Sequence, residues 1–267
     1  MSRLLSRILS WGFRRYVHRF VRKNFNAVRV AGQQQLGRLP EAPIVCFINH
    51  PGWWDPMVAV LMTDLFFPGR RFAAPMDAEA LGHYPILGRL GFFPVERDAA
   101  SGAREFLRAS RKLLRDSQAM LWLTPAGMFH DVRQSARFKN GLGHLVDSEF
   151  HGTALPMAIE YTFWNERTPE LLVRFGTPVD CAALPPDRDA RTTVFETALA
   201  TTQEMLAQQA IARDPSSFTT LALGRAGVGG GYDLWRRTVA CLRGQRFHSR
   251  HDGTALGPAR GVEGGDA

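Results

Sequence analysis

Cysteine is scarce in this sequence. The three cysteines among 267 residues, Cys46, Cys181 and Cys241, are odd in number and lie far apart. This spacing argues against a disulfide framework and against a paired-cysteine metal site, and it favours a reducing compartment. We therefore expect no metal ion in the protein.

A long apolar run is also missing. The most hydrophobic region, residues 44–62, is interrupted by His50 and Asp55, whereas a membrane-spanning helix needs about 18 or more consecutive apolar residues. The basic N-terminus lacks the continuous apolar block and the small-residue cleavage site of a signal peptide. The sequence thus indicates neither a membrane span nor secretion.

Acidic residues are absent from the first 40 positions, which hold nine arginines and lysines. The formal net charge of the chain is +8, yet residues 41–224 carry 17 basic and 21 acidic side chains. The positive charge is therefore concentrated in the N-terminal arm. A slightly acidic body argues against a surface that coats nucleic acid, so no nucleic-acid partner is expected.

Residues 1–24 predict a basic amphipathic helix, because apolar residues recur at helical spacing with arginines between them. Such a helix can lie in the interface of an anionic bilayer, which predicts a peripheral or monotopic protein on the cytoplasmic face of the cell membrane. The alternative is a first helix that packs on its own domain and leaves a basic face in water. The predicted membrane contacts are Leu4, Leu5, Ile8, Trp11, Arg14 and Arg15.

The rest of the chain alternates between strand-like and helix-like segments. This alternation predicts an α/β fold over residues 25–213, a single layered domain with a mixed, mostly parallel sheet covered by helices. The expected strands are residues 27–31, 44–48, 71–74, 91–95, 119–123, 153–161 and 171–175. The expected helices are residues 56–67, 77–81, 87–90, 101–116, 141–147 and 193–212.

The composition changes to glycine and arginine after residue 213. Residues 214–246 are predicted to form an extension that contains a helix at 232–243. Residues 247–267 show no periodicity, and we expect a mobile tail there.

The most informative segment is residues 48–56, INHPGWWDP. His50 follows a strand, and Asp55 stands before a proline at the start of a helix, as a capping residue does. The turn between them can fold the carboxylate onto the imidazole, an arrangement that orients a histidine base. The alternative is that Asp55 only caps the helix and His50 only makes a structural hydrogen bond, because these roles need the same residues at the same spacing. Trp53 and Trp54 suit an acyl channel or a bilayer surface, and core packing suits them equally.

Further segments follow in a defined order. They are residues 91–97 (GFFPVER), residues 124–129 (TPAGMF) and residues 155–159 (LPMAI). Together with Asn49, His50 and Asp55 in the pattern NHxxxxD, they resemble the lysophospholipid acyltransferase family of the 1-acylglycerol-3-phosphate type. The resemblance covers roughly residues 25–180, and four segments in order are far more specific than any one of them.

The resemblance implies an O-acyltransferase that moves a fatty acyl group from acyl-CoA or acyl carrier protein to a hydroxyl of a lysolipid, without a cofactor. His50 would take the hydroxyl proton while Asp55 holds and polarises His50. Arg97 would bind the anionic headgroup of the acceptor, although a surface ion pair with Glu96 or Asp98 is the alternative. The other residues assigned to substrate binding are Asn49, Pro125, Gly127, Arg133 and Lys139.

The third segment departs from the family pattern, Phe-Pro-Glu-Gly-Thr-Arg. Ala126 stands in place of the carboxylate and Phe129 in place of the arginine. Asp131, Arg133 and Arg137 of the following loop are the candidate replacements. The acceptor can therefore be a lysophosphatidate, an ornithine-lipid precursor or a glycolipid, and a catalytically silent lipid-binding protein is the remaining alternative.

Overall fold

The computed structural model describes residues 3–96 and 100–224. The predicted helix at 232–243, the predicted tail at 247–267 and Arg97 lie outside the described residues. The helices are α1 (Arg3–Asn24), α2 (Asp55–Phe66), α3 (Ala78–His83), α4 (Pro85–Gly88), α5 (Ala100–Leu113), α6 (Gly141–Leu145) and α7 (Arg188–Ala212). The strands are β1 (Ala27–Ala31), β2 (Ile44–Ile48), β3 (Arg71–Asp77), β4 (Phe92–Val95), β5 (Ala119–Leu123), β6 (Thr153–Thr162), β7 (Glu170–Phe175) and β8 (Thr219–Leu223).

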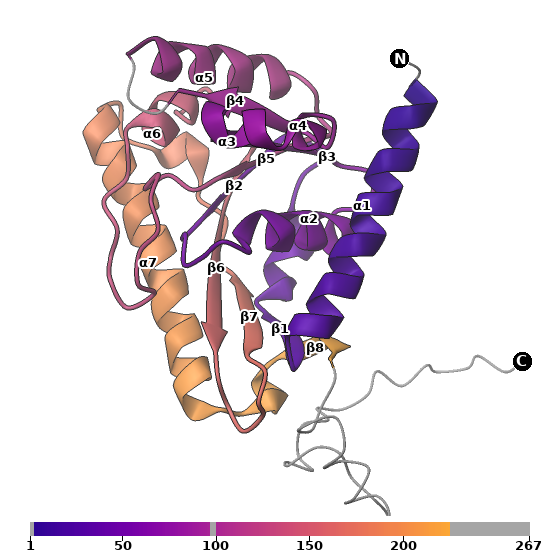
Figure 1. The fold of residues 1–267 in the computed structure, drawn as a ribbon. Coiled ribbons are helices and arrows are strands. Elements are labelled where there is room, and N and C mark those ends of the chain that lie inside the picture. The colour runs from indigo at the N-terminus through magenta and orange to yellow at the C-terminus, as the bar shows by residue number, and fades with distance from the viewer. Residues whose placement is uncertain (1–2, 97–99, 225–267) are drawn as a thin grey trace, which may run out of the picture.

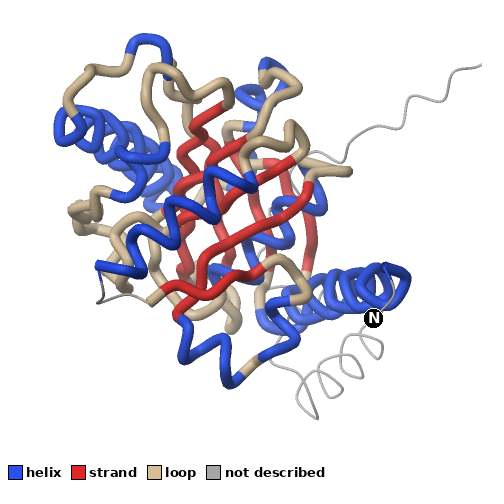
Figure 2. Tube along the Cα trace, turned by 90° about the horizontal axis from the view of Figure 1, so that it is seen from above, coloured by secondary structure: helices blue, strands red, loops and turns tan. Residues whose placement is uncertain are grey.

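One eight-stranded sheet runs through the domain in the order β4-β3-β5-β2-β6-β7-β1-β8. Parallel pairing joins β4 to β3, β3 to β5, β5 to β2, β2 to β6 and β7 to β1, whereas β6–β7 and β1–β8 are antiparallel. Helices cover both faces of the sheet (Figures 1 and 2). The predicted mixed, mostly parallel sheet is confirmed.

The central strand β2 is buried on both of its faces. Ile44, Cys46 and Ile48 contribute to the core cluster under α1 and α2. Val45 and Phe47 contribute to the opposite cluster under α6 and α7. Alternate side chains of a strand point to opposite faces, so an uninterrupted apolar run is what a doubly covered strand requires. The sequence IVCFI meets this requirement.

The domain extends beyond residue 213, where the sequence placed its end. Strand β8 pairs antiparallel with β1 and forms an edge of the sheet. The side chains of β8 are only half-buried or exposed. A short edge strand with so little burial has only a weak hydrophobic pattern in the sequence. The strand β8 forms because the backbone N–H and C=O groups on the outer edge of β1 need hydrogen-bond partners.

Helix α1, which ends at Asn24, packs on the domain, the alternative that the sequence left open. Val17 and Val21 are buried in the core. Asp64 of α2 accepts from Arg14 at 2.7 Å and lies 2.9 Å from Nε2 of His18. Arg14, predicted as a membrane contact, is therefore paired within the protein. Among the described residues, no helix combines the length and the apolar character needed to cross a bilayer.

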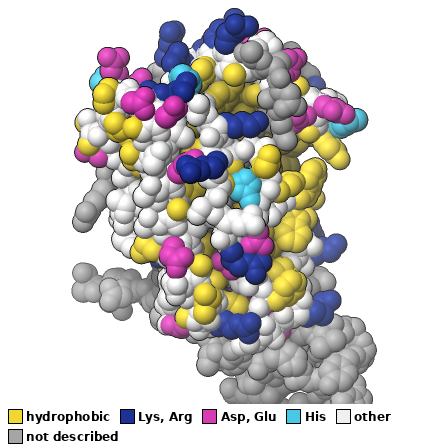
Figure 3. All heavy atoms as spheres, turned by 90° about the vertical axis from the view of Figure 1, so that its left-hand side faces the viewer, with side chains coloured by type: hydrophobic (Ala, Val, Ile, Leu, Met, Phe, Trp, Pro, Cys, Tyr) yellow, Lys and Arg dark blue, Asp and Glu magenta, His cyan; other side chains and the backbone are white. Residues whose placement is uncertain are grey.

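The outer surface carries mixed charge. On the face shown in Figure 3, basic and acidic side chains are interspersed, and hydrophobic side chains gather along its right-hand margin. This mixture agrees with the near balance of charges that the sequence shows between residues 41 and 224.

A buried ion pair joins the strands β1, β7 and β8. Arg29 of β1 donates to Glu170 of β7 at 2.9 Å and to the hydroxyl of Thr220 in β8 at 2.8 Å. Asn26 donates to the second oxygen of the same carboxylate, and the ring of Trp164 lies 5.2 Å from the guanidinium carbon of Arg29. The side chains of Arg29 and Glu170 are 1% and 2% exposed. A buried arginine of this kind depends on its partner, because desolvation of an unpaired charge is costly.

Glu170→Ala is expected to lower the free energy of unfolding by about 3–5 kcal/mol, since Arg29 would stay buried without its carboxylate. Urea unfolding of the purified protein measures the change. The control is Glu204→Ala, which removes an exposed carboxylate of α7 and should cost no more than about 0.5 kcal/mol. Equal stability of the two variants would contradict the assigned role of the pair.

Candidate active site

The candidate site lies at the carboxyl end of β2. After β2 the chain builds β3, β4 and β5 on one side of this strand, and only later adds β6 on its other side. A change of direction of this kind opens a crevice at the carboxyl ends of the strands, where ligands bind in open α/β sheets. The turn after β2, the loop after β5 and the end of β6 meet there.

His50 and Asp55 form a close pair across this turn. Nδ1 of His50 lies 2.5 Å from Oδ2 of Asp55, which also accepts the backbone N–H of Gly52 at 3.2 Å. An ionised carboxylate only accepts hydrogen bonds, so Nδ1 carries the proton. Among the described residues Nε2 of His50 has no recorded hydrogen-bond partner, and it is therefore available to accept a proton from a ligand.

Asp55 is not the capping residue that the sequence predicted. Trp54 occupies the N-cap position of α2, and Asp55 is the first helical residue. Its side chain makes no cap because both oxygens have other partners. Oδ1 accepts the hydroxyl of Tyr161, from β6, at 2.6 Å. With 1% exposure, the carboxylate depends on these donors, as a buried charge does.

Asn49 connects the end of β2 to β6. Its amide nitrogen donates to the carbonyl of Ile159 at 2.9 Å, and its amide oxygen accepts the N–H of the same residue at 2.8 Å. Both polar ends of a buried side chain are thereby used. Asn49, for which the sequence predicts a contact with substrate, is thus attached to β6 directly before His50.

Three predicted binding residues come together after β5. Thr124 accepts the N–H of Gly127 at 2.9 Å and closes a turn around the buried Pro125. Gly127 has φ +74° and lies under the side chain of Lys139, whose Cε would be 3.1 Å from an added Cβ. The N–H of Lys139 donates to the carbonyl of Pro125 at 2.9 Å. Glycine suits both the left-handed backbone and the close approach.

Phe129 packs directly on His50. The centroids of the two rings lie 4.3 Å apart with an interplanar angle of 52°, and Phe129 is 56% exposed. The N–H of His130 donates to the carbonyl of His50 at 3.1 Å, which holds this loop against the turn. An exposed apolar ring thus borders the imidazole at the position where the family carries an arginine.

The basic residues of the next loop are already paired. Arg133 binds both carboxylate oxygens of Asp131 at 2.7 Å, and these hydrogen bonds lower the pKa of Asp131 to about 2. Arg137 lies 3.2 Å from Glu196 of α7. Burial raises the pKa of the nearby Glu160. Arg133 and Arg137 remain largely exposed, at 82% and 91% of their side chains.

The two tryptophans of the first motif have different surroundings. Trp53 is 71% exposed in the turn between β2 and α2. Trp54 packs edge-on against Phe25 at 5.0 Å, Tyr161 at 5.4 Å and Phe20 at 6.3 Å. One tryptophan is therefore available to a ligand or a surface, and the other joins α1 to the site.

Sequence reasoning missed Tyr161 and the contact of Phe129 with His50. Tyr161 was placed only as the last residue of a strand, and no motif indicated its partner 106 positions earlier. The sequence shows that Phe129 replaces the arginine of the family pattern, but it does not show that the ring of Phe129 packs on His50. The described residues contain no group of three or more histidine, cysteine or acidic side chains that could hold a metal ion.

Comparison with known proteins identifies the family of the chain. The family profile described as Acyltransferase matches residues 27–160, half of the chain. The protein therefore belongs to the Acyltransferase family, and the class of enzyme that the sequence motifs indicated is confirmed. No curated protein sequence matches the chain significantly.

Among solved structures, the fold is similar to that of the 1-acyl-sn-glycerophosphate (LPA) acyltransferase PlsC from Thermotoga maritima. The TM-score is 0.52 at 16% sequence identity, over 76% of this chain and 82% of that chain. The likeness extends over most of both proteins and shows a common fold.

Proposed function

We propose that this protein transfers a fatty acyl group from an acyl thioester, on CoA or acyl carrier protein, to a free hydroxyl of a lysolipid. The observation that carries the proposal is the His50–Asp55 pair, in which Nδ1 lies 2.5 Å from the carboxylate and Nε2 has no hydrogen-bond partner among the described residues. A histidine oriented in this way is a general base. The carboxyl end of β2 lies where the strand order changes direction, which is the place where ligands bind in open α/β sheets.

The reaction needs no covalent intermediate on the protein. Nε2 of His50 takes the hydroxyl proton while the oxygen attacks the thioester carbonyl, and the C–S bond then breaks. The imidazolium returns the proton to the leaving thiolate, so the products are an ester and a free thiol. Asp55 stabilises the imidazolium between these steps.

His50→Ala is expected to lower acyl transfer by about 10²–10⁴-fold or more, the usual contribution of a general base. Release of free CoA from palmitoyl-CoA with 1-acylglycerol-3-phosphate measures the rate. His151→Ala, which removes an exposed histidine, is the matched control and should keep full activity. Wild-type activity in His50→Ala would contradict the proposed base, and lipid binding without thiol release by the wild type would favour a lipid-binding protein instead.

The acceptor site shows a specific difference from the family pattern. Ala126 removes a carboxylate, and Phe129 places an apolar ring 4.3 Å from the imidazole of His50. Lys139 lies over Gly127 of the third motif, and we propose that it contacts the acceptor headgroup together with Arg97 and Arg133. This arrangement favours, as a second candidate, an acceptor whose reacting hydroxyl has no phosphate beside it, such as an ornithine-lipid precursor or a glycolipid.

Phe129→Arg tests this second candidate. An arginine there adds a charge-assisted contact to phosphate, so kcat/KM for 1-acylglycerol-3-phosphate should rise at least about tenfold relative to a lyso-ornithine lipid. Met128→Arg, a charge added at the neighbouring exposed residue, is the control for general attraction. An unchanged ratio in Phe129→Arg would rule out selection by this ring.

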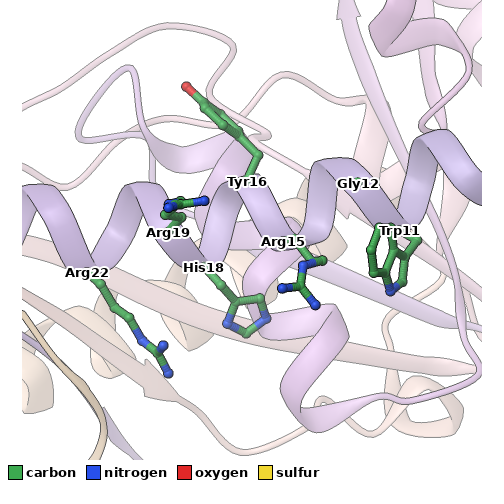
Figure 4. Close-up of a pocket in the computed structure, with 7 residues that line it drawn as sticks. All are labelled: Trp11, Gly12, Arg15, Tyr16, His18, Arg19 and Arg22. Atoms are coloured by element: carbon green, nitrogen blue, oxygen red, sulfur yellow. The ribbon is translucent and has the colours of Figure 1, made fainter.

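Helix α1 supports a position at the membrane. Ile8, Trp11 and Tyr16 are exposed by 55%, 61% and 54%, and Arg15 lies 4.9 Å over the ring of Trp11. Figure 4 shows Trp11, Arg15, His18 and Arg22 on one side of the helix. Together with Gly12, Tyr16 and Arg19 they line a pocket of about 780 Å³. Apolar side chains among arginines suit the interface of an anionic bilayer. We propose attachment to the cytoplasmic face of the cell membrane through this helix.

The double variant Ile8→Ser/Trp11→Ser should reduce binding to vesicles of phosphatidylglycerol and phosphatidylcholine by at least about tenfold, because two large apolar contacts are lost. Co-sedimentation measures the bound fraction. Ile211→Ser, at an apolar side chain of α7 that is 73% exposed, is the control. Unaltered binding of the double variant would place the membrane contact elsewhere. Binding should also weaken with added salt.

A further inference from the structure

The buried carboxylate of Asp55 has two oxygens with different partners. Oδ2 faces His50 and the N–H of Gly52, at 2.5 and 3.2 Å. Oδ1 faces the hydroxyl of Tyr161 at 2.6 Å, its one recorded donor among the described residues. Because Asp55 is 1% exposed, water does not readily replace that donor.

The hydroxyl of Tyr161 remains a donor at neutral pH. Burial raises the pKa of the phenol well above its ordinary value, and the negative charge of Asp55 and the hydrogen bond to it raise it further. A phenolate at this position would place two negative charges side by side in a buried site. The proton therefore stays on Tyr161 and points at Oδ1.

The ring of Tyr161 is held on several sides. Phe25 stacks on it with centroids 5.8 Å apart, and Trp54 meets it edge-on at 5.4 Å. Gly52 lies close to the ring edge, since an added Cβ would be 3.4 Å from Cε2 of Tyr161. Phe20 of α1 in turn packs on Trp54. The direction of the hydroxyl is thus set by packing before any substrate binds.

We propose that Tyr161 is a positioning residue that acts on His50 through Asp55. Its hydrogen bond stops the carboxylate from rotating about χ2, so that Oδ2 stays aligned with Nδ1 and the imidazole presents Nε2 to the substrate. This role rests on the proposed acyl transfer for its kinetic consequence, but the orientation of His50 is observable without any substrate.

Tyr161→Phe removes only the hydroxyl and keeps the ring between Phe25 and Trp54. In the full chain with labelled histidine rings, the ¹⁵N resonances of His50, assigned by their loss in His50→Ala, should shift in this variant. Tyr84→Phe, which removes a hydroxyl from an exposed tyrosine, should leave them in place. Identical His50 signals in the wild type and Tyr161→Phe would overturn the proposal whether or not the acyl-transfer assay succeeds.

The kinetic arm separates positioning from a general loss of structure. With palmitoyl-CoA and 1-acylglycerol-3-phosphate, kcat of Tyr161→Phe should fall about tenfold or more while both KM values stay unchanged. In an Asp55→Asn background the same substitution should have little further effect, because the two residues act as a unit. Full activity of Tyr161→Phe, or effects that multiply in the double variant, would overturn the role. Loss of activity in His50→Ala with full activity in Tyr161→Phe would reject Tyr161 alone and leave the proposed function intact.

Discussion

The burial of one negative charge governs the arrangement around the candidate site. Asp55 sits at the first position of α2 with 1% exposure, and a carboxylate without water requires donors from the protein. The turn supplies His50 and Gly52, and β6 supplies Tyr161. Satisfying this carboxylate therefore fixes the turn, the start of the helix and the end of a distant strand relative to one another.

The pairing of β2 with β6 serves the same requirement. Strand β6 runs beyond the end of β2, so its last residues lie beside the turn. Asn49 bonds both backbone groups of Ile159, and Tyr161 reaches Asp55 two residues further along. Parallel pairing of β2 with β6 thus brings a backbone anchor and a side-chain donor to one carboxyl edge.

Helix α1 packs against the core with some of its side chains and exposes apolar and basic side chains elsewhere. Val17 and Val21 belong to the core, and Phe20 packs on Trp54 next to the site. Ile8, Trp11 and Arg15 instead form an exposed surface that is both apolar and basic. An amphipathic helix can satisfy both because different parts of its length and circumference face different surroundings. Helix α1 consequently carries the proposed membrane contact on one part of its length and packs against Trp54, beside the site, on another.

The sequence by itself determined the features that depend on neighbouring residues. The doubly buried β2, the close approach of His50 to Asp55 across a short turn, the family and the mostly parallel sheet all follow from local pattern and motif order. Only the tertiary structure decided which groups meet across long separations: Tyr161 with Asp55, Phe129 with His50, and β8 with β1. Such contacts leave no periodic signal, because they depend on strand order and on the direction of loops. A buried charge takes its partners from whatever the fold brings within hydrogen-bond distance, and that distance is a property of the folded chain alone.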